Sequence, residues 1–155
     1  MDFRTDSMDD MKVVCMEHRG PYNQIGGVFQ KLWEFTQKHS LKVEDSKWLG
    51  IYWDDPSTVP PEELRSEACV TVGKKDPLPD SDDVTVRLLP SGRYLIGTHV
   101  GSYSGLGAAW GEIWAEIGRG GHTMRKSPCF ELYVRGGDDG LPEEEWVTEL
   151  CMPIE

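Results

Sequence analysis

The stretch His18-Arg-Gly-Pro-Tyr22 decides the fold, because it recurs 81 residues later as His99-Val-Gly-Ser-Tyr103. At the same offset Gly26 matches Gly107, Trp33 matches Trp114 and Tyr52 matches Tyr133. A gapless register that keeps bulky aromatic residues far from the first motif indicates an internal duplication. Two copies are too few for a solenoid, so the repeat predicts one domain with pseudo-two-fold symmetry.

Each copy carries the same order of predicted elements. Residues 12–18 and 93–100 are apolar or β-branched and predict strands, and the glycine that follows each strand predicts a sharp turn. A helix follows, because apolar residues then recur at spacings of three and four. Two more strands complete each copy, at 48–53 and 68–72 in the first and at 129–134 and 147–152 in the second. A further strand is expected at 84–89.

Residues 76–83 read Asp-Pro-Leu-Pro-Asp-Ser-Asp-Asp, which is a connector rather than a core segment. The sequence therefore predicts one domain over 1–155, with a first half at about 11–75 and a second at about 84–155. Residues 1–10 and 136–145 are expected to be solvated. The predicted class is α+β: duplicated strand–helix–strand–strand units in an antiparallel sheet, two helices on one face, and a ligand groove between the halves.

Composition excludes several functions. The 155 residues carry a formal net charge of −11, which argues against direct nucleic-acid binding and favours cationic partners. No apolar run approaches about 18 residues, so no membrane span is expected. The acidic N-terminus is not a signal peptide, and the four cysteines form no C-x-x-C pair. We therefore expect a cytoplasmic protein with reduced cysteines and neither metal nor cofactor.

Glu131 is the first candidate for chemistry. It alternates with Tyr133 in a predicted strand, so both side chains share one face, and the first copy carries Gly50 and Tyr52 at the matching positions. A carboxylate facing an aromatic cavity suits either the binding of an aromatic cation or general acid–base catalysis. An edge-strand glutamate that faces water is the alternative.

The remaining aromatic residues divide by position. Helical spacing predicts core packing for Trp33, Trp110 and Trp114. Trp53 is expected to face either the helices or the groove, and Trp146 is either a pocket lid or a strand anchor. Tyr22 and Tyr103 begin matched helices, where a hydroxyl reaches the groove or solvent. His18 and His99 end matched strands, and we expect a structural role for them.

Taken in order, the motifs resemble those of the GyrI-like small-molecule-binding family, which is related to the effector-binding domains of AraC-type and MerR-type multidrug regulators. The segments that carry the resemblance are His18–Tyr22, Ile51–Pro56, Pro61–Arg65 with Ala68–Val70, Gly92–Tyr94, His99–Tyr103, Trp110, Pro128–Tyr133 and Thr148–Pro153. They span residues 12–155. Ser102 replaces the proline of the usual Gly-Pro-Tyr in the second copy, and no helix-turn-helix segment is present.

The resemblance implies a stand-alone bacterial protein that binds lipophilic, aromatic or cationic molecules in a groove with Glu131 at its centre. Such binding would contribute to xenobiotic resistance. One alternative is a hydrolase that opens cyclopropane rings of DNA-alkylating natural products, with Glu131 as general base and Tyr133 as orienting or oxyanion donor. A second alternative is a gyrase-interacting protein. The resemblance also leaves a homodimer as one of the possible oligomeric states. The candidate ligand-binding residues are Tyr22, Gly50, Tyr52, Trp53, Tyr103, Trp110, Glu131, Tyr133 and Trp146.

Overall fold

The computed structural model describes all residues from 1 to 155, in two compact units. The first unit is residues 10–89, and the second unit combines residues 1–9 with residues 90–155. Each unit has antiparallel strands and one long helix, so the predicted α+β class is confirmed. None of the helices has the length and apolar character needed to cross a bilayer.

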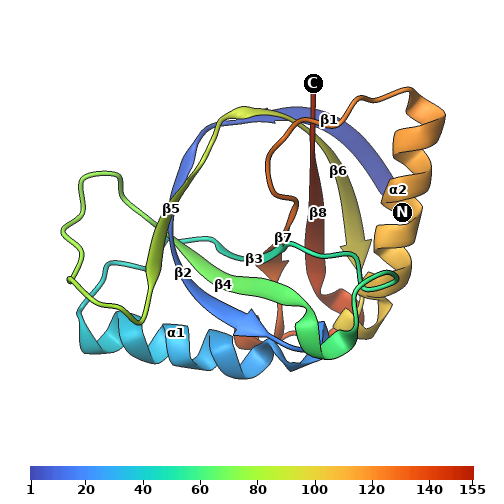
Figure 1. The fold of residues 1–155 in the computed structure, drawn as a ribbon. Coiled ribbons are helices and arrows are strands. Elements are labelled where there is room, and N and C mark those ends of the chain that lie inside the picture. The colour runs from blue at the N-terminus through green and yellow to red at the C-terminus, as the bar shows by residue number, and fades with distance from the viewer. The chain divides into compact units, whose positions relative to one another are not determined.

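The first unit has its four strands in the order β3-β4-β2-β5. Helix α1 buries Leu32 and Phe35 against Val14 of β2 and against Ala68 and Val70 of β4 (Figure 1). Because side chains alternate along a strand, the residues between these core positions lie on the opposite face. In chain order the elements are β2 (Met11–Arg19), α1 (Gly26–Lys38), β3 (Trp48–Tyr52), β4 (Arg65–Val72) and β5 (Thr85–Leu89).

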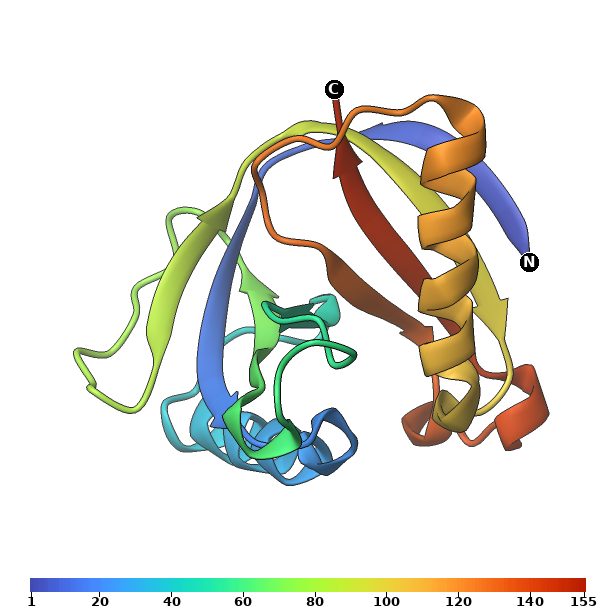
Figure 2. The ribbon, with the colours of Figure 1, turned by 45° about the vertical axis from the view of Figure 1, so that its right-hand side comes forward.

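The second unit repeats this plan in the order β1-β6-β8-β7. Helix α2 lies along β6 and β8 in Figure 2, and its Leu106, Ala109 and Ile113 pack on Leu95 and Leu150. The elements are β1 (Asp2–Met8), β6 (Gly92–Val100), α2 (Leu106–Gly120), β7 (Phe130–Arg135) and β8 (Val147–Ile154). Short 3-10 helices lie at Tyr22–Gln24, Pro61–Glu63, Tyr103–Gly105, Gly137–Asp139 and Glu143–Glu145.

Matched glycine turns lead from the first strand of each unit into its helix. Gly20 has φ +129° and Gly101 has φ +131°, a region that residues with a side chain rarely adopt. The Nε2 atom of His18 lies 3.0 Å from the carbonyl oxygen of Pro21, and that of His99 lies 2.9 Å from the carbonyl oxygen of Ser102. A carbonyl only accepts, so each ring nitrogen donates. Both histidines thus hold a turn, in the structural role expected from sequence.

The outer strands are exchanged between the units. Strand β1 leads directly into β2 of the first unit yet pairs with β6, whereas β5 leads into β6 and pairs with β2. Residues 2–8 were expected to be a solvated end. They are largely exposed, but their backbone is paired, and their mostly polar sequence lacks the alternation that announces a strand.

An equivalent ion pair ties each outer strand to its unit. Arg4 of β1 binds Glu149 at 2.6 Å, and Arg87 of β5 binds Glu67 at 2.8 Å. The two glutamates occupy the same register, because Glu67 stands opposite Ile51 and Glu149 stands opposite Leu132, the residue that the repeat aligns with Ile51. The duplication therefore extends to an ion pair that the offset of 81 residues does not reveal.

The prediction of core packing is wrong for Trp33 and Trp114. Their side chains are 49% and 51% exposed, whereas Leu32 and Ile113, one residue earlier, are fully buried. One residue corresponds to a rotation of about 100° around a helix, so the tryptophans lie at the edge of the apolar stripe. The apolar stripe of each helix is therefore wider than the part of the helix that packs against the strands.

Replacing Leu32 with alanine should lower the free energy of unfolding by about 3 kcal/mol, because the side chain is completely buried in the α1 core. Urea unfolding followed by far-ultraviolet circular dichroism measures the change. Lys31→Ala is the matched control on the exposed side of the same helix and should change stability by less than about 0.5 kcal/mol. Equal effects of the two substitutions would contradict the packing described here.

Candidate functional site

Glu131 is buried on the helix side of the second unit. It stands opposite Leu150 on β8, which belongs to the core under α2, and only 4% of Glu131 is exposed. Its Oε2 atom accepts a hydrogen bond from Nε1 of Trp110 on α2 at 3.2 Å, and its Oε1 atom accepts one from the Tyr133 hydroxyl at 3.3 Å. A carboxylate taken out of water requires such donors, and two aromatic side chains supply them here.

A row of aromatic rings continues from this carboxylate toward the surface. The Tyr133 ring lies 5.6 Å from the Tyr103 ring at an angle of 61°, and Tyr103 lies 4.8 Å from the ring of Trp146. Trp146 is fixed by a hydrogen bond from Nε1 to the carbonyl oxygen of Leu141 at 3.0 Å. Such rings offer flat apolar faces beside a buried carboxyl group.

Gly136 leaves room for the Tyr103 hydroxyl, which would have to shift if this residue had a side chain. A Cβ atom at this position would lie 2.9 Å from the Tyr103 hydroxyl, which is closer than the two atoms can pack. The glycine-containing segment after β7, which the sequence marked only as solvated, therefore lets Tyr103 approach the chain. The site is thus built from α2, β7 and the segment between β7 and β8.

The first unit brings two of its predicted residues, Tyr22 and Tyr52, into contact. The rings of Tyr22 and Tyr52 lie 4.8 Å apart at 71°. The Tyr22 hydroxyl donates to the carbonyl oxygen of Asp54 at 2.8 Å and accepts from the Asp54 amide at 3.0 Å. Gly50 is buried opposite Ala68, on the α1 side of β3. The position that matches Glu131 in the repeat therefore also faces a helix.

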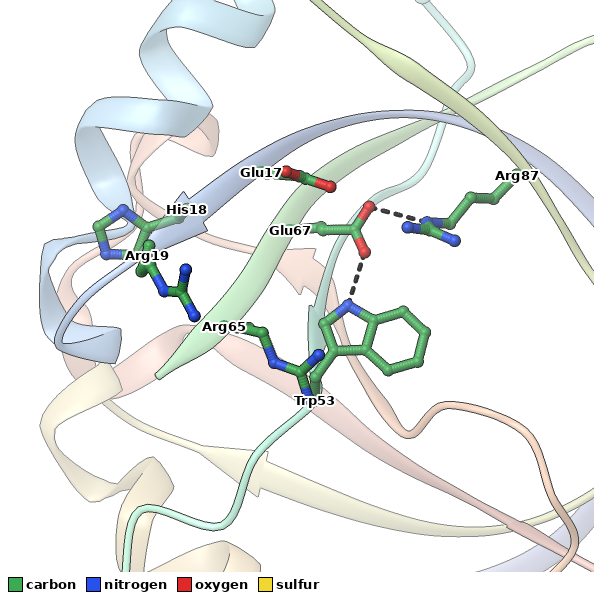
Figure 3. A pocket seen from close by; sticks show the side chains of 7 residues that line it. All are labelled: Glu17, His18, Arg19, Trp53, Arg65, Glu67 and Arg87. Carbon is green, nitrogen blue, oxygen red and sulfur yellow. Dashed lines mark hydrogen bonds and ion pairs between the residues drawn. The ribbon is translucent and has the colours of Figure 1, made fainter. Parts of the chain in front are cut away.

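Trp53 belongs to a different cluster, on the strand face away from α1. Its Nε1 atom donates to Oε2 of Glu67 at 2.5 Å, and Nε of Arg87 donates to Oε1 of the same carboxylate at 2.8 Å (Figure 3). Glu67 is only 2% exposed, and the Arg87 guanidinium lies 5.3 Å from the centroid of the Trp53 ring. The carboxylate thus fixes both the tryptophan and the arginine.

Sequence reasoning missed Glu67, although a signal was available. Strand β2 ends, and strand β4 begins, with Glu and Arg two residues apart: Glu17 and Arg19 in β2, and Arg65 and Glu67 in β4. Residues two apart in a strand share a face, so the pattern predicts a charged cluster on one side of both strands. The repeat drew attention to positions that are identical at the offset of 81 residues, and Glu67 escaped it because Thr148 stands at that offset, whereas its structural match is Glu149.

The phenol of Tyr103 remains protonated well beyond neutral pH. Burial raises the pKa of Tyr103, and the negative charges of Asp138, Glu131 and Asp139 raise it further. The unfolded chain loses this proton at its usual value near 10, before the folded protein does. Folding stability therefore falls as the pH rises above about 10, because the folded state then holds more protons than the unfolded state.

We expect the Tyr103 hydroxyl to titrate above pH 10, and Asp138→Asn to bring its pKa down by removing one of the repelling charges. The difference between the ultraviolet tyrosinate titrations of the wild type and Tyr103→Phe isolates this group. Glu112→Gln, an exposed carboxylate on α2, is the control and should leave the curve unchanged. A Tyr103 pKa at or below 10 would refute the environment described.

Comparison with known proteins identifies a family and several named relatives. Residues 1–155 match the family described as the GyrI-like small molecule binding domain. A protein named DNA gyrase inhibitor from Pectobacterium carotovorum is 28% identical over 158 residues, covering 100% of this chain and 98% of the relative. The probable transcriptional regulator YgiV of Escherichia coli is 32% identical over 114 residues, covering 72% and 69%.

Solved structures show the same fold. The C-terminal domain of EcmrR superposes with a TM-score of 0.82 at 17% identity, covering 99% of this chain and 97% of that one. SAV2435 bound to tetraphenylphosphonium gives 0.68 at 20% identity, covering 100% and 94%. A hydrolase from Listeria innocua gives 0.62 at 12% identity, covering 99% and 91%. The match along the whole sequence carries the assignment: this chain belongs to the GyrI-like small molecule binding domain family.

Proposed function

We propose that this protein binds lipophilic aromatic cations, with Glu131 as the buried counter-charge. The observation that carries the proposal is a carboxylate with 4% exposure that accepts hydrogen bonds from the side chains of two aromatic residues. A cation placed among these rings would gain from the carboxylate and from the ring faces together. The net charge of −11 would raise the local concentration of such ligands.

Tyr103 is the residue at the entrance in this proposal. Its ring is 42% exposed, and it lies between Tyr133, which contacts Glu131, and Trp146. A flat ligand would therefore meet Tyr103 first and the carboxylate last. The neutral state of the phenol supports this role, because an apolar ligand need not displace a charge to pass it.

The test compares a cation with a neutral molecule of similar shape. Tetraphenylphosphonium, the ligand named in the SAV2435 structure, should bind the wild type more tightly than triphenylphosphine oxide. Glu131→Gln should weaken tetraphenylphosphonium binding by tenfold or more and remove the preference for the cation, since a charge-assisted contact of about 1.5 kcal/mol or more is lost. Isothermal titration calorimetry measures both ligands.

Glu112→Gln serves as the control, because it removes a carboxylate from an exposed position on α2. It should leave both affinities unchanged. Trp110→Phe keeps an aromatic ring but removes the N–H donor to Glu131, so it should have a smaller effect than Glu131→Gln. Unchanged binding of the cation to Glu131→Gln would remove the glutamate from the site.

A hydrolase is the second candidate, since a buried carboxyl group such as that of Glu131 can serve as a general base. In this reading Glu131 takes a proton from water while the water oxygen bonds to a cyclopropane carbon. The breaking carbon–carbon bond passes its electron pair into the conjugated system of the substrate, and a hydrogen bond stabilises the oxygen that gains the charge. Glu131 then returns the proton.

Two contacts favour binding over this hydrolysis. The Trp110 N–H and the Tyr133 hydroxyl both point to Glu131, so either would have to turn away before it could hold a substrate oxygen. With a cyclopropane-bearing DNA alkylator in excess, a hydrolase gives many ring-opened products per protein by mass spectrometry, and Glu131→Gln gives none. A binding module gives no product with either protein.

An interaction with DNA gyrase is the third candidate. It is favoured by relatives that carry the name DNA gyrase inhibitor, which match this chain over its full length. A complex with gyrase that survives saturation with tetraphenylphosphonium would place the contact outside the Glu131 site. The acidic surface would compete for a basic DNA-binding face, although acidity alone is a common property.

A further inference from the structure

The first unit contains a cavity that the Glu131 site does not use. Its volume is about 350 Å³, and it is lined on the strand face away from α1 by charged side chains and Trp53 (Figure 3). This volume falls in the range of small-molecule pockets, about 300–1,000 Å³. No residue of the cavity belongs to the cluster around Glu131, so the two sites are built independently.

Trp53 is the fixed apolar wall of this cavity. The ring is 40% exposed, yet its N–H is held at 2.5 Å by a carboxylate that is almost fully buried. Arg87 binds the same carboxylate and lies against the ring. An exposed tryptophan normally samples several rotamers, and this one is restrained by Glu67 from behind. Restraint of this kind prepares a flat surface for stacking.

The charges of the cavity are arranged in like-charged pairs. Glu17 stands directly opposite Glu67, and Arg19 stands directly opposite Arg65, across β2 and β4. Figure 3 shows the two carboxylates together, with the guanidinium groups of Arg19 and Arg65 below them. Like charges directly opposite each other destabilise a sheet, so this arrangement needs a compensation or a use.

Only one member of each pair is compensated within the protein. Arg87 neutralises Glu67, and Asp54 binds Arg65 through two hydrogen bonds of 2.8 and 3.1 Å. The bond to Arg65 lowers the pKa of Asp54, so the Asp54 carboxylate remains charged. Glu17 and Arg19 are exposed, and no hydrogen bond or ion pair ties either side chain. Glu17 and Arg19, two residues apart on one strand, therefore keep their hydrogen-bonding groups available at the cavity, although the Arg19 charge also helps to lower the pKa of Asp54.

The second unit shows that the fold does not need these charges. At the register of the Arg19–Arg65 pair it has Val100 opposite Val147, and at the position of Glu17 it has Thr98 opposite Glu149. The same strands pair in the same way without them. The acid and the arginine that have no partner are thus specific to the first unit, and their placement calls for a role other than folding.

We propose that this cavity binds a small zwitterion with a flat side group, of the aromatic α-amino acid type. The ammonium group would lie against Glu17, the carboxylate against Arg19, and the ring on Trp53. Arg65 lies beside Arg19 and carries an Nη1 group that Asp54 does not occupy, so it can add a second donor to the ligand carboxylate. A ligand with one of the two charges would leave the other protein charge unmatched.

The test follows the indole N–H resonance of Trp53 in a two-dimensional ¹⁵N spectrum of the full chain. Loss of one of the six indole signals in Trp53→Phe assigns the resonance. Titration with L-phenylalanine should move this signal in a saturable way. N-acetyl-L-phenylalanine lacks the ammonium group and L-phenylalaninamide lacks the carboxylate, so each should bind about tenfold more weakly or worse.

Substitutions on the protein complete the experiment. Glu17→Gln and Arg19→Gln should each weaken phenylalanine binding by about tenfold, and neither side chain is buried, so both variants should fold. Arg119→Gln, which removes an exposed arginine of α2, should not change the affinity. The proposal is overturned if phenylalanine gives no saturable shift, if the blocked analogues bind equally well, or if Glu17→Gln and Arg19→Gln bind like the wild type.

Discussion

The antiparallel pairing of β2 with β4, and of β6 with β8, is the constraint on which the rest of the structure depends. These central pairs place one row of apolar side chains toward the helix of each unit, and α1 and α2 are held by that row. They also fix which residues share the other face. Glu67 reaches Arg87 and Trp53 because it lies in register with Ile51 and Glu17, and a slip of one residue would turn its carboxylate into the core under α1. Packing and site geometry are thus set by one register.

Both candidate sites use a carboxylate that is removed from water. An isolated buried charge is costly, and the protein offsets this cost differently in the two places. Glu67 has a guanidinium and an indole N–H, so its charge is neutralised and it acts as a support for Trp53. Glu131 accepts from an indole and a phenol, which are neutral donors. The first carboxylate positions other side chains, and the second is the group that the proposed cation would approach.

Much of the fold could be predicted from the sequence, because the turn motifs at His18 and His99 and the apolar periodicity after them are local signals. The orientation of Trp33 and Trp114 could not, since helical spacing defines a stripe but not how much of it the strands cover. Strand β1 escaped notice because pairing of its backbone with β6 requires no apolar side chains. Strand alternation predicted that Glu131 and Tyr133 share a face, and their side chains are in contact. Glu67 was not, because its importance comes from Arg87 and Trp53, which are distant in sequence and meet only after β5 has paired with β2.

The exchange of the outer strands has a consequence for how the chain relates to its own repeat. Each copy is preceded by a strand that pairs with the other copy. Strand β1 leads into β2 but pairs with β6, and β5 leads into β6 but pairs with β2. Two separate copies, each with its leading strand attached, could exchange those strands and so complete each other. The present chain has the connectivity of that reciprocal pair joined end to end. Because both copies lie in one chain, the exchange of strands does not depend on protein concentration.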